Sequence, residues 1–333
     1  MLRALSISKS MMQTVLLITS LGVIAGLISG NQVFGIGRDY QAYTDFFERI
    51  KDFGWESLIG ERFEIGFGFS SFLLVSIFSS EIVIYGILSA VSFIIKVYAL
   101  RIIGCGFWIG IFFYLTRFFP LYEMSQLRVA LGASLVMLSF VLEDRGSRKL
   151  ALLMICAGIT FHWVVIILLP FVFLDTNKRT LLSVFVLTLG LLATLKLFPS
   201  TYFSNAAQLF RTFQYYEIMG FGGADNINYF PVAIFLDLAI VIGGLYFWRF
   251  TSAIMKKILI AQIFSFAIFY ALIEFPILAW RFHDIFAVLM TLYVSAAFGC
   301  CRTLRRSVVV YVVLSSALYT YMAFVKDPLF GIT

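Results

Sequence analysis

The sequence contains few charged residues. Asp, Glu, Lys and Arg make up only 13% of its 333 residues, about half of the roughly 25% found in soluble domains. Together with a hydrophobic fraction of 61%, this deficit excludes a disordered chain, a coiled coil and a collagen-like protein. The four cysteines lie in or at the ends of apolar segments and form no C-x-x-C motif. They therefore exclude a disulfide-stapled secreted domain, and we predict no disulfide.

Several motifs of soluble enzymes and pumps are also absent. The sequence has no G-x-x-x-x-G-K-[ST] motif, which argues against an ATP-driven pump. Its two histidines, His162 and His283, lie far apart, and no H-E-x-x-H or Asp-x-Asp motif occurs. We therefore predict no metal and no other cofactor. A nucleophile motif of the G-x-S-x-G type is missing as well.

Long apolar runs dominate the sequence. Hydrophobic residues make up 61% of the chain, with 38 phenylalanines, and runs long enough to cross a bilayer recur throughout. We therefore predict an all-α polytopic membrane protein, with residues 1–333 forming a single transmembrane domain in contact with the lipid bilayer. The net charge of +7 comes from short clusters between apolar runs and predicts no nucleic-acid binding. Residues 11–30 form a run of full span length, interpreted as a retained first helix and not a signal peptide.

The basic clusters predict the topology of the chain. The apolar segments run at 11–30, 64–79, 82–100, 102–119, 126–142, 150–174, 181–198, 230–248, 258–276, 284–300 and 307–324. The clusters predicted to face the cytoplasm, with Arg3 and Lys9, are Lys96/Arg101, Arg145/Arg148/Lys149, Lys178/Arg179, Arg249/Lys256/Lys257 and Arg302/Arg305/Arg306. This topology predicts about nine full spans, with the long loops 31–63 and 199–229 on the outer face. Because functional residues concentrate on loops held by a rigid scaffold, the site is expected to face outward.

Two apolar segments cannot be simple spans in this topology. Residues 64–79 are short, rich in Gly and Ser and open with Glu64, so we interpret them as a re-entrant or interfacial helix. Residues 150–174 have basic clusters at both ends, and one straight helix cannot begin and end on the same face. We predict a broken hairpin with its break near residues 159–163 and His162 at the tip.

The first outer loop carries the densest charge in the chain. Its acids Asp45, Glu48, Asp52 and Glu56 are interpreted as solvated. The Arg38-Asp39-Tyr40 stretch follows a Gly-x-Gly turn just above the membrane, and Glu64 lies at the membrane boundary. A carboxylate facing a cavity there can act as a general base, especially if burial raises its pKa.

Other polar residues lie at or within the apolar segments. Arg128 is either an interfacial anchor or an anion clamp, since the fixed fork of arginine donors suits phosphate oxygens. His162 is either a hydrogen-bonded core residue or a functional group, because ionisable residues inside membrane segments usually have a role. Arg281 belongs to a cluster with His283 and Asp284. Further polar residues are Arg211, Tyr215 and Tyr216 in the second loop, and Lys196, Asp237 and Glu274, which have no assigned role.

The order of these motifs resembles the EpsG-like family of bacterial polysaccharide polymerases, which is related to the Wzy O-antigen and capsule polymerases. The motifs are Arg38-Asp39-Tyr40 with Tyr43, Glu64-x-Gly-Phe, Arg128-x-Ala-Leu and Ala157-x-x-x-Phe-His162. The resemblance covers residues 31 to 180 and, less closely, the Arg281 region. There the family has Arg followed by Tyr, whereas this chain has Phe282, His283 and Asp284, which leaves the roles of His283 and Asp284 open.

The resemblance implies a metal-independent glycosyltransferase with a GT-C-like helical bundle in the bacterial cytoplasmic (inner) membrane. Its expected substrates are undecaprenyl-diphosphate-linked oligosaccharides, and a chain-length regulator protein is a possible partner. We expect Glu64 or Asp39 as the base, with His162 sharing the proton transfer or orienting the acceptor. The expected substrate-binding residues are Arg128 and Arg281 for the diphosphate, Arg38 and Arg211 as further candidates, and Tyr40 and Tyr43 for sugar rings.

Two other functions stay open. A transporter or flippase of a lipid-linked glycan shares the need for intramembrane cations but is typically built from internal repeats, which this sequence lacks. A membrane acyltransferase acting on surface sugars needs a histidine beside an Asp or Arg, as in Arg281-Phe-His283-Asp284.

Overall fold

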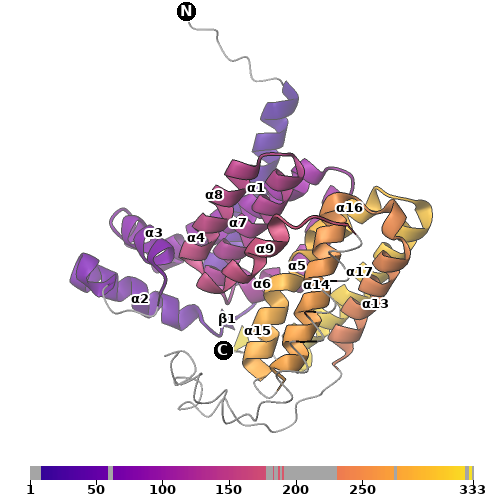
Figure 1. The fold of residues 1–333 in the computed structure, drawn as a ribbon. Coiled ribbons are helices and arrows are strands. Elements are labelled where there is room, and N and C mark those ends of the chain that lie inside the picture. The colour runs from indigo at the N-terminus through magenta and orange to yellow at the C-terminus, as the bar shows by residue number, and fades with distance from the viewer. Residues whose placement is uncertain are drawn as a thin grey trace, which may run out of the picture. The chain divides into compact units, whose positions relative to one another are not determined.

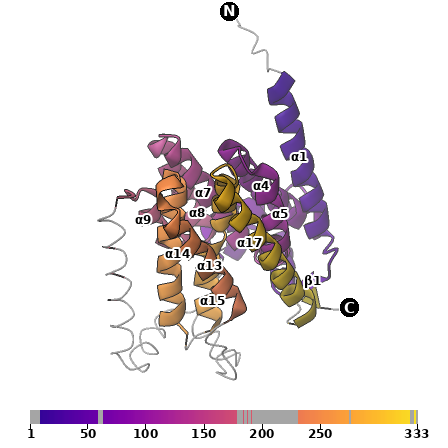
Figure 2. The same cartoon turned by 90° about the vertical axis from the view of Figure 1, so that its right-hand side faces the viewer.

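The computed structural model describes residues 9–58, 63–177, 231–273, 276–326 and 330–331, with the single positions 183, 187 and 190. Helices form nearly all of this part of the chain (Figures 1 and 2). Five of the described helices are long and apolar enough to cross a membrane, and they span Met11–Gly30, Glu81–Ile103, Ala253–Ala271, Ala279–Phe298 and Arg302–Val325. The protein is therefore a multi-pass α-helical membrane protein, while the nine spans and the GT-C-like bundle stay predictions.

The described chain divides into two compact units, Met1–Ile167 with Ser316–Thr333, and Leu168–Ser315. The first unit contains α1 (Lys9–Gly30), β1 (Ile36–Gly37), α2 (Tyr40–Phe53), α3 (Ile65–Val75), α4 (Glu81–Ile103), α5 (Phe107–Arg117), α6 (Phe119–Tyr122), α7 (Leu127–Asp144), α8 (Arg148–Phe161) and β2 (Phe330–Gly331), with a 3₁₀ helix at Gly54–Leu58. The second contains α9 (Leu169–Val172), α13 (Val232–Tyr246), a 3₁₀ helix at Trp248–Phe250, α14 (Ala253–Ala271), α15 (Pro276–Ala287) and α16 (Met290–Phe298). The boundaries between the units fall inside two elements, the 3₁₀ helix at Trp163–Leu168 and helix α17 (Arg302–Tyr321). A π-helical turn at Met322–Lys326 follows α17.

Small residues bring α1 and α4 together in the first unit. Gly22, Gly26 and Gly30 recur at every fourth position of α1, and a Cβ on Gly26 would lie 2.5 Å from the carbonyl oxygen of Gly86 in α4. Such glycine repeats let two membrane helices approach until their backbones touch. Helix α4 packs on its other side against α7, and α7 in turn packs against α8.

The stretch predicted as the loop 31–63 is largely ordered structure. Strand β1 pairs with β2 in antiparallel orientation, and α2 buries Tyr43, Phe46, Phe47 and Ile50. These residues are spaced three or four apart, as on the apolar face of an amphipathic helix. The acids interpreted as solvated, Asp45, Glu48, Asp52 and Glu56, are indeed exposed.

The segments 64–79 and 150–174, which were predicted not to be simple spans, do not form full-length helices. Helix α3 begins directly after Glu64 and has 11 residues, so at 1.5 Å per residue it is only about 17 Å long. Helix α8 ends at Phe161, His162 has extended backbone angles, and a 3₁₀ helix follows from Trp163. The predicted break at His162 is thus present.

Two cations predicted to face the cytoplasm are buried instead. The side chain of Lys96 is 1% exposed and lies 2.6 Å from Glu123, and Lys257 donates a hydrogen bond to the carbonyl oxygen of Val172. The assignment of these two residues to loop clusters was wrong. Their side chains extend from helices into the protein, where ion pairing or a backbone acceptor replaces water.

Candidate functional site

Three polar side chains from distant parts of the sequence meet in the first unit. Arg128 Nη1 donates a hydrogen bond to Glu64 Oε2 at 2.6 Å, and His162 Nδ1 lies 2.9 Å from Glu64 Oε1. Glu64 precedes α3, Arg128 lies in the first turn of α7, and His162 follows the last residue of α8. Each side chain is between 11% and 20% exposed, so the cluster is largely buried but accessible from one side.

Glycines explain how these elements come so close. A Cβ on Gly158 of α8 would lie 3.1 Å from the carbonyl oxygen of Gly132 in α7, and a Cβ on Gly132 would lie 3.2 Å from the Cβ of His162. In the same way, a Cβ on Gly66 of α3 would lie 2.3 Å from the hydroxyl of Thr160. Backbone contact at these points sets α3, α7 and α8 near enough for Glu64 to reach Arg128 and His162.

The cluster determines the charge of its carboxylate. Burial raises the pKa of Glu64, but the hydrogen bond with His162 and the positive charge of Arg128 lower it more, so that it falls below its ordinary value. Burial does act in the expected direction, but the two neighbouring groups outweigh it, so the condition under which Glu64 would be the better base is not met. Glu64 is ionised at neutral pH, where it accepts from both neighbours.

Aromatic side chains hold Arg128 from the other side. Its guanidinium lies over the ring of Phe63 at 4.8 Å from the centroid, a favourable cation–π contact. The hydroxyl of Tyr43 lies 3.5 Å from the backbone nitrogen of Arg128. Tyr43 is only 3% exposed and packs against Phe63, Phe67 and Tyr85, so its ring belongs to the aromatic core. Burial raises the pKa of its hydroxyl, while Arg128 lowers it in part.

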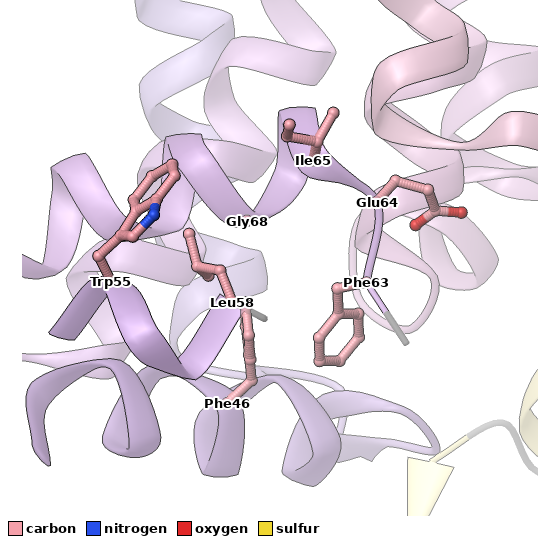
Figure 3. Close-up of a pocket in the computed structure, with 7 residues that line it drawn as sticks. All are labelled: Phe46, Trp55, Leu58, Phe63, Glu64, Ile65 and Gly68. Carbon is pink, nitrogen blue, oxygen red and sulfur yellow. The ribbon is translucent and has the colours of Figure 1, made fainter. Parts of the chain in front are cut away.

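A cavity of about 250 Å³ lies beside the cluster. Figure 3 shows its lining residues, Phe46, Trp55, Leu58, Phe63, Glu64, Ile65 and Gly68. In this view the carboxylate of Glu64 points away from Trp55 and Leu58. The cavity is therefore apolar, and Phe63 is common to the cavity and to the contact with Arg128.

The Arg38-Asp39-Tyr40 stretch precedes and begins α2. Arg38 is exposed, and Asp39 is the residue before the helix, where its side chain makes no capping hydrogen bond. The ring of Tyr40 packs on Tyr85 at 4.9 Å, and its hydroxyl lies 3.4 Å from the carbonyl oxygen of Gly30. The negative charge of Asp39 adds to the rise that burial causes in the pKa of Tyr43.

The remaining predicted residues lie elsewhere. Arg281 is in α15, within the second unit. Arg211, the loop 199–229, Lys196 and Glu274 lie outside the described residues. The substrate-binding roles expected for Arg281 and Arg211 therefore stay predictions.

Sequence reasoning missed a buried ion pair that supports Arg128. Lys96 Nζ donates to Glu123 Oε1 at 2.6 Å, to Ser92 at 2.7 Å and to the carbonyl oxygen of Ala130 in the first turn of α7 at 3.0 Å. The hydroxyl of Tyr114 donates to the other oxygen of Glu123. The sequence contained one signal for this ion pair, because Lys96 lies inside the apolar run 82–100. Ionisable residues inside such runs are seldom simple loop charges.

The second unit contains a separate network around the other histidine. His283 accepts or donates at both ring nitrogens, with Ser265 at 2.8 Å and Asp237 at 3.1 Å. Tyr311 donates to the other oxygen of Asp237 at 2.7 Å. The residues come from α13, α14, α15 and α17, of which Figure 2 shows α13 and α14 side by side. Asp237, Ser265 and His283 are all 0% exposed, so this network links helices inside the protein.

The five helices able to cross a membrane define the class of this protein as a polytopic membrane protein. Its first unit holds a partly accessible Arg–Glu–His cluster beside an apolar cavity. Among the described residues, no group of three His, Cys, Asp or Glu side chains is placed to hold a metal. Residues 15–332 match the EpsG family, and because this is nearly the whole chain, the protein belongs to that family. No curated protein and no solved structure matches the chain. Family membership indicates a polysaccharide-polymerase-type, glycosyltransferase-like membrane protein.

Proposed function

We propose that this protein lengthens a lipid-linked glycan. The growing chain moves from undecaprenyl diphosphate onto the oligosaccharide repeat unit of a second carrier lipid, at the outer (periplasmic) face of the bacterial cytoplasmic membrane. The cluster of Glu64, Arg128 and His162 carries this proposal, because it combines a cation for the diphosphate with groups that can take a proton from a sugar hydroxyl. Membership of the EpsG family supports it.

The lowered pKa of Glu64 favours His162 as the base of the cluster. A carboxylate with a pKa below its ordinary value is a poor proton acceptor near neutral pH. We therefore assign the proton transfer to Nε2 of His162, while Glu64 orients the ring through Nδ1 and stabilises the imidazolium that forms. Asp39, the other predicted carboxylate, is assigned to a hydroxyl of the acceptor sugar.

The proposed step is a displacement at the anomeric carbon. The acceptor hydroxyl oxygen forms a bond to this carbon, its proton goes to His162, and the bond from the carbon to the diphosphate oxygen breaks. The departing undecaprenyl diphosphate keeps the electron pair, and Arg128 stabilises its growing charge. Tyr43 is assigned to holding Arg128, because its ring is buried. We keep Arg281, Arg38 and Arg211 as further contacts to the diphosphate and Tyr40 as a contact to sugar.

The first test is polymerisation by the purified protein. Lipid-diphosphate-linked repeat units extracted from the source cells are incubated with the protein without nucleotide sugar and in the presence of EDTA. A ladder of longer glycans is the expected result. A ladder that needs Mg²⁺ would preserve the enzyme and reject metal independence, whereas no ladder under either condition would favour transport.

Arg128→Gln tests whether Arg128 stabilises the leaving diphosphate. Because it removes one preorganised donor to the leaving group, we expect the rate of ladder formation to fall about 10²–10³-fold. Lys51→Gln is the matched control, since Lys51 forms an ion pair with Glu81 in which both side chains are about a quarter to a third exposed. An Arg128→Gln protein that polymerises at the rate of the control would reject the clamp.

A further inference from the structure

The cavity beside the cluster has the chemistry of a hydrocarbon site. Among the seven described residues that line it, only Glu64 is charged, and Figure 3 shows its carboxylate turned away from Trp55 and Leu58. A sugar enclosed here would leave most of its hydroxyls without hydrogen-bond partners, at a cost for each one. A hydrocarbon chain has no hydrogen bonds to give up in such a space, and its apolar surface stays out of water there.

The surface around the cavity is apolar as well. Ile65 is 73% exposed, and the other large apolar side chains exposed in this region are Phe53, Trp55, Phe69, Leu73 and Ile77. Large apolar residues exposed together on a membrane protein are stable against lipid chains and costly against water. Ile65, Phe69, Leu73 and Ile77 recur at every fourth position, so one side of α3 is suited to the hydrocarbon part of the bilayer, while the exposed Asp52 and Glu56 mark the side suited to water.

Phe63 joins this apolar cavity to a positive charge. Its ring lines the cavity and also lies under the guanidinium of Arg128, 4.8 Å from the ring centroid. The ligand that fits both features has an anionic group attached directly to a hydrocarbon chain. Resting on the function proposed above, we propose that the cavity binds the first isoprene units of the carrier lipid, next to the diphosphate held by Arg128.

Gly68 provides a direct way to test this site. A Cβ on Gly68 would lie 3.2 Å from Leu58 Cδ2, the end of a flexible side chain, so a larger residue can enter the cavity. Gly68→Leu fills the space and also replaces a glycine inside a helix by a good helix former. Ser76→Leu adds the same side chain at the exposed C-terminal end of α3 and serves as the matched control.

The experiment measures binding of three probes to the purified full-length protein: undecaprenyl diphosphate, farnesyl diphosphate and inorganic diphosphate. We expect Gly68→Leu to weaken binding of both prenyl diphosphates about tenfold, the effect of losing roughly two buried methylene groups. Its affinity for inorganic diphosphate and all three affinities of Ser76→Leu should equal those of the wild type. If Gly68→Leu fails to fold, Trp55→Ala removes one wall and should give the same selective loss.

Other results would overturn the proposal. Equal weakening for all three probes, or no change for any, would mean that the cavity does not bind the isoprenoid. If Gly68→Leu loses affinity for soluble repeat-unit glycan alone, the cavity binds a sugar. If a phospholipid occupies the cavity and undecaprenyl diphosphate fails to displace it, the cavity belongs to the bilayer contact of the protein. A wild-type protein that binds none of the diphosphates would instead reject the proposed function itself.

Discussion

The protein contains two pairs of a carboxylate with a histidine, and the two pairs differ mainly in burial. Glu64 and His162 lie 2.9 Å apart with 11–12% of each side chain exposed, whereas Asp237 and His283 lie 3.1 Å apart and are fully buried. The first pair shares its carboxylate with Arg128 and borders a cavity. The second has protein partners at both ring nitrogens of the histidine and both oxygens of the carboxylate.

This comparison shows that the same pair of functional groups can serve different purposes. A histidine that takes a proton from a substrate must reach that substrate. The side chain of His162 is 11% exposed, whereas His283 is enclosed by Ser265 and Asp237 and stacks near the ring of Phe266. We therefore assign chemistry to the first pair and helix association to the second. The buried position of His283 also argues against its use by an acyltransferase.

The largest expected effect comes from His162→Gln. The glutamine amide retains a donor toward Glu64 but is no base, so we expect the polymerisation rate to fall about 10²–10⁴-fold. The melting temperature of the purified protein should stay near that of the wild type, because His162 is partly exposed. If His162→Gln keeps most of the wild-type polymerisation rate, His162 is not the base, and the proposed difference between the two pairs is contradicted.

His283→Ala should lower the stability of the protein and leave the polymerisation rate nearly unchanged. It leaves a buried carboxylate without one of its partners, so we expect the free energy of unfolding to fall by about 1–3 kcal/mol. Unfolding in sodium dodecyl sulfate measures this change, and the polymerisation rate of the protein that remains folded should stay within a few fold of the wild type. In Asp237→Ala/His283→Ala the loss should be smaller than the sum of the single losses. A normal stability with an abolished rate would reverse the two assignments.

The smallest expected effect is the pH dependence caused by Glu64. Because its pKa is lowered in the folded protein, its contribution to stability is fully present above the ordinary pKa of glutamate and is lost as the pH falls through the lowered pKa. The melting temperature of Glu64→Gln should thus lie below that of the wild type at neutral pH, and the gap should close in acid.

Glu81→Gln, which alters the exposed pair with Lys51, controls for general effects of losing a surface carboxylate. A gap between Glu64→Gln and the wild type that widens in acid would contradict the assigned direction of the pKa shift.

Much of the site was visible in the sequence because its members stand out from an apolar background. Arg128 and His162 are ionisable groups at or within apolar runs, and Glu64 opens a run that is too short and too rich in Gly and Ser for a span. Such residues are rare in membrane segments and usually have a role. The break at His162 followed from basic clusters at both ends of one apolar run, which the observed end of α8 at Phe161 matches.

Other features depend on distances that a sequence does not contain. Helix α2 was interpreted as a loop because its charged residues obscured the apolar face formed by Tyr43, Phe46, Phe47 and Ile50. Lys96 was assigned to a cytoplasmic cluster, although its ammonium group lies inside the protein beside Glu123. Charge patterns reveal which residues are polar but not which acceptor each one reaches.

The sequence by itself determined the class of protein, because a bilayer demands long apolar helices and tolerates few charges. It also identified Glu64, Arg128 and His162 as candidates, through their polarity in apolar surroundings. Only the tertiary structure decided that these three residues touch, that Glu64 is held ionised, and that the two histidines lie in different environments. The physical reason is that helix contacts at Gly66, Gly132 and Gly158 set the distances on which ion pairing and pKa depend.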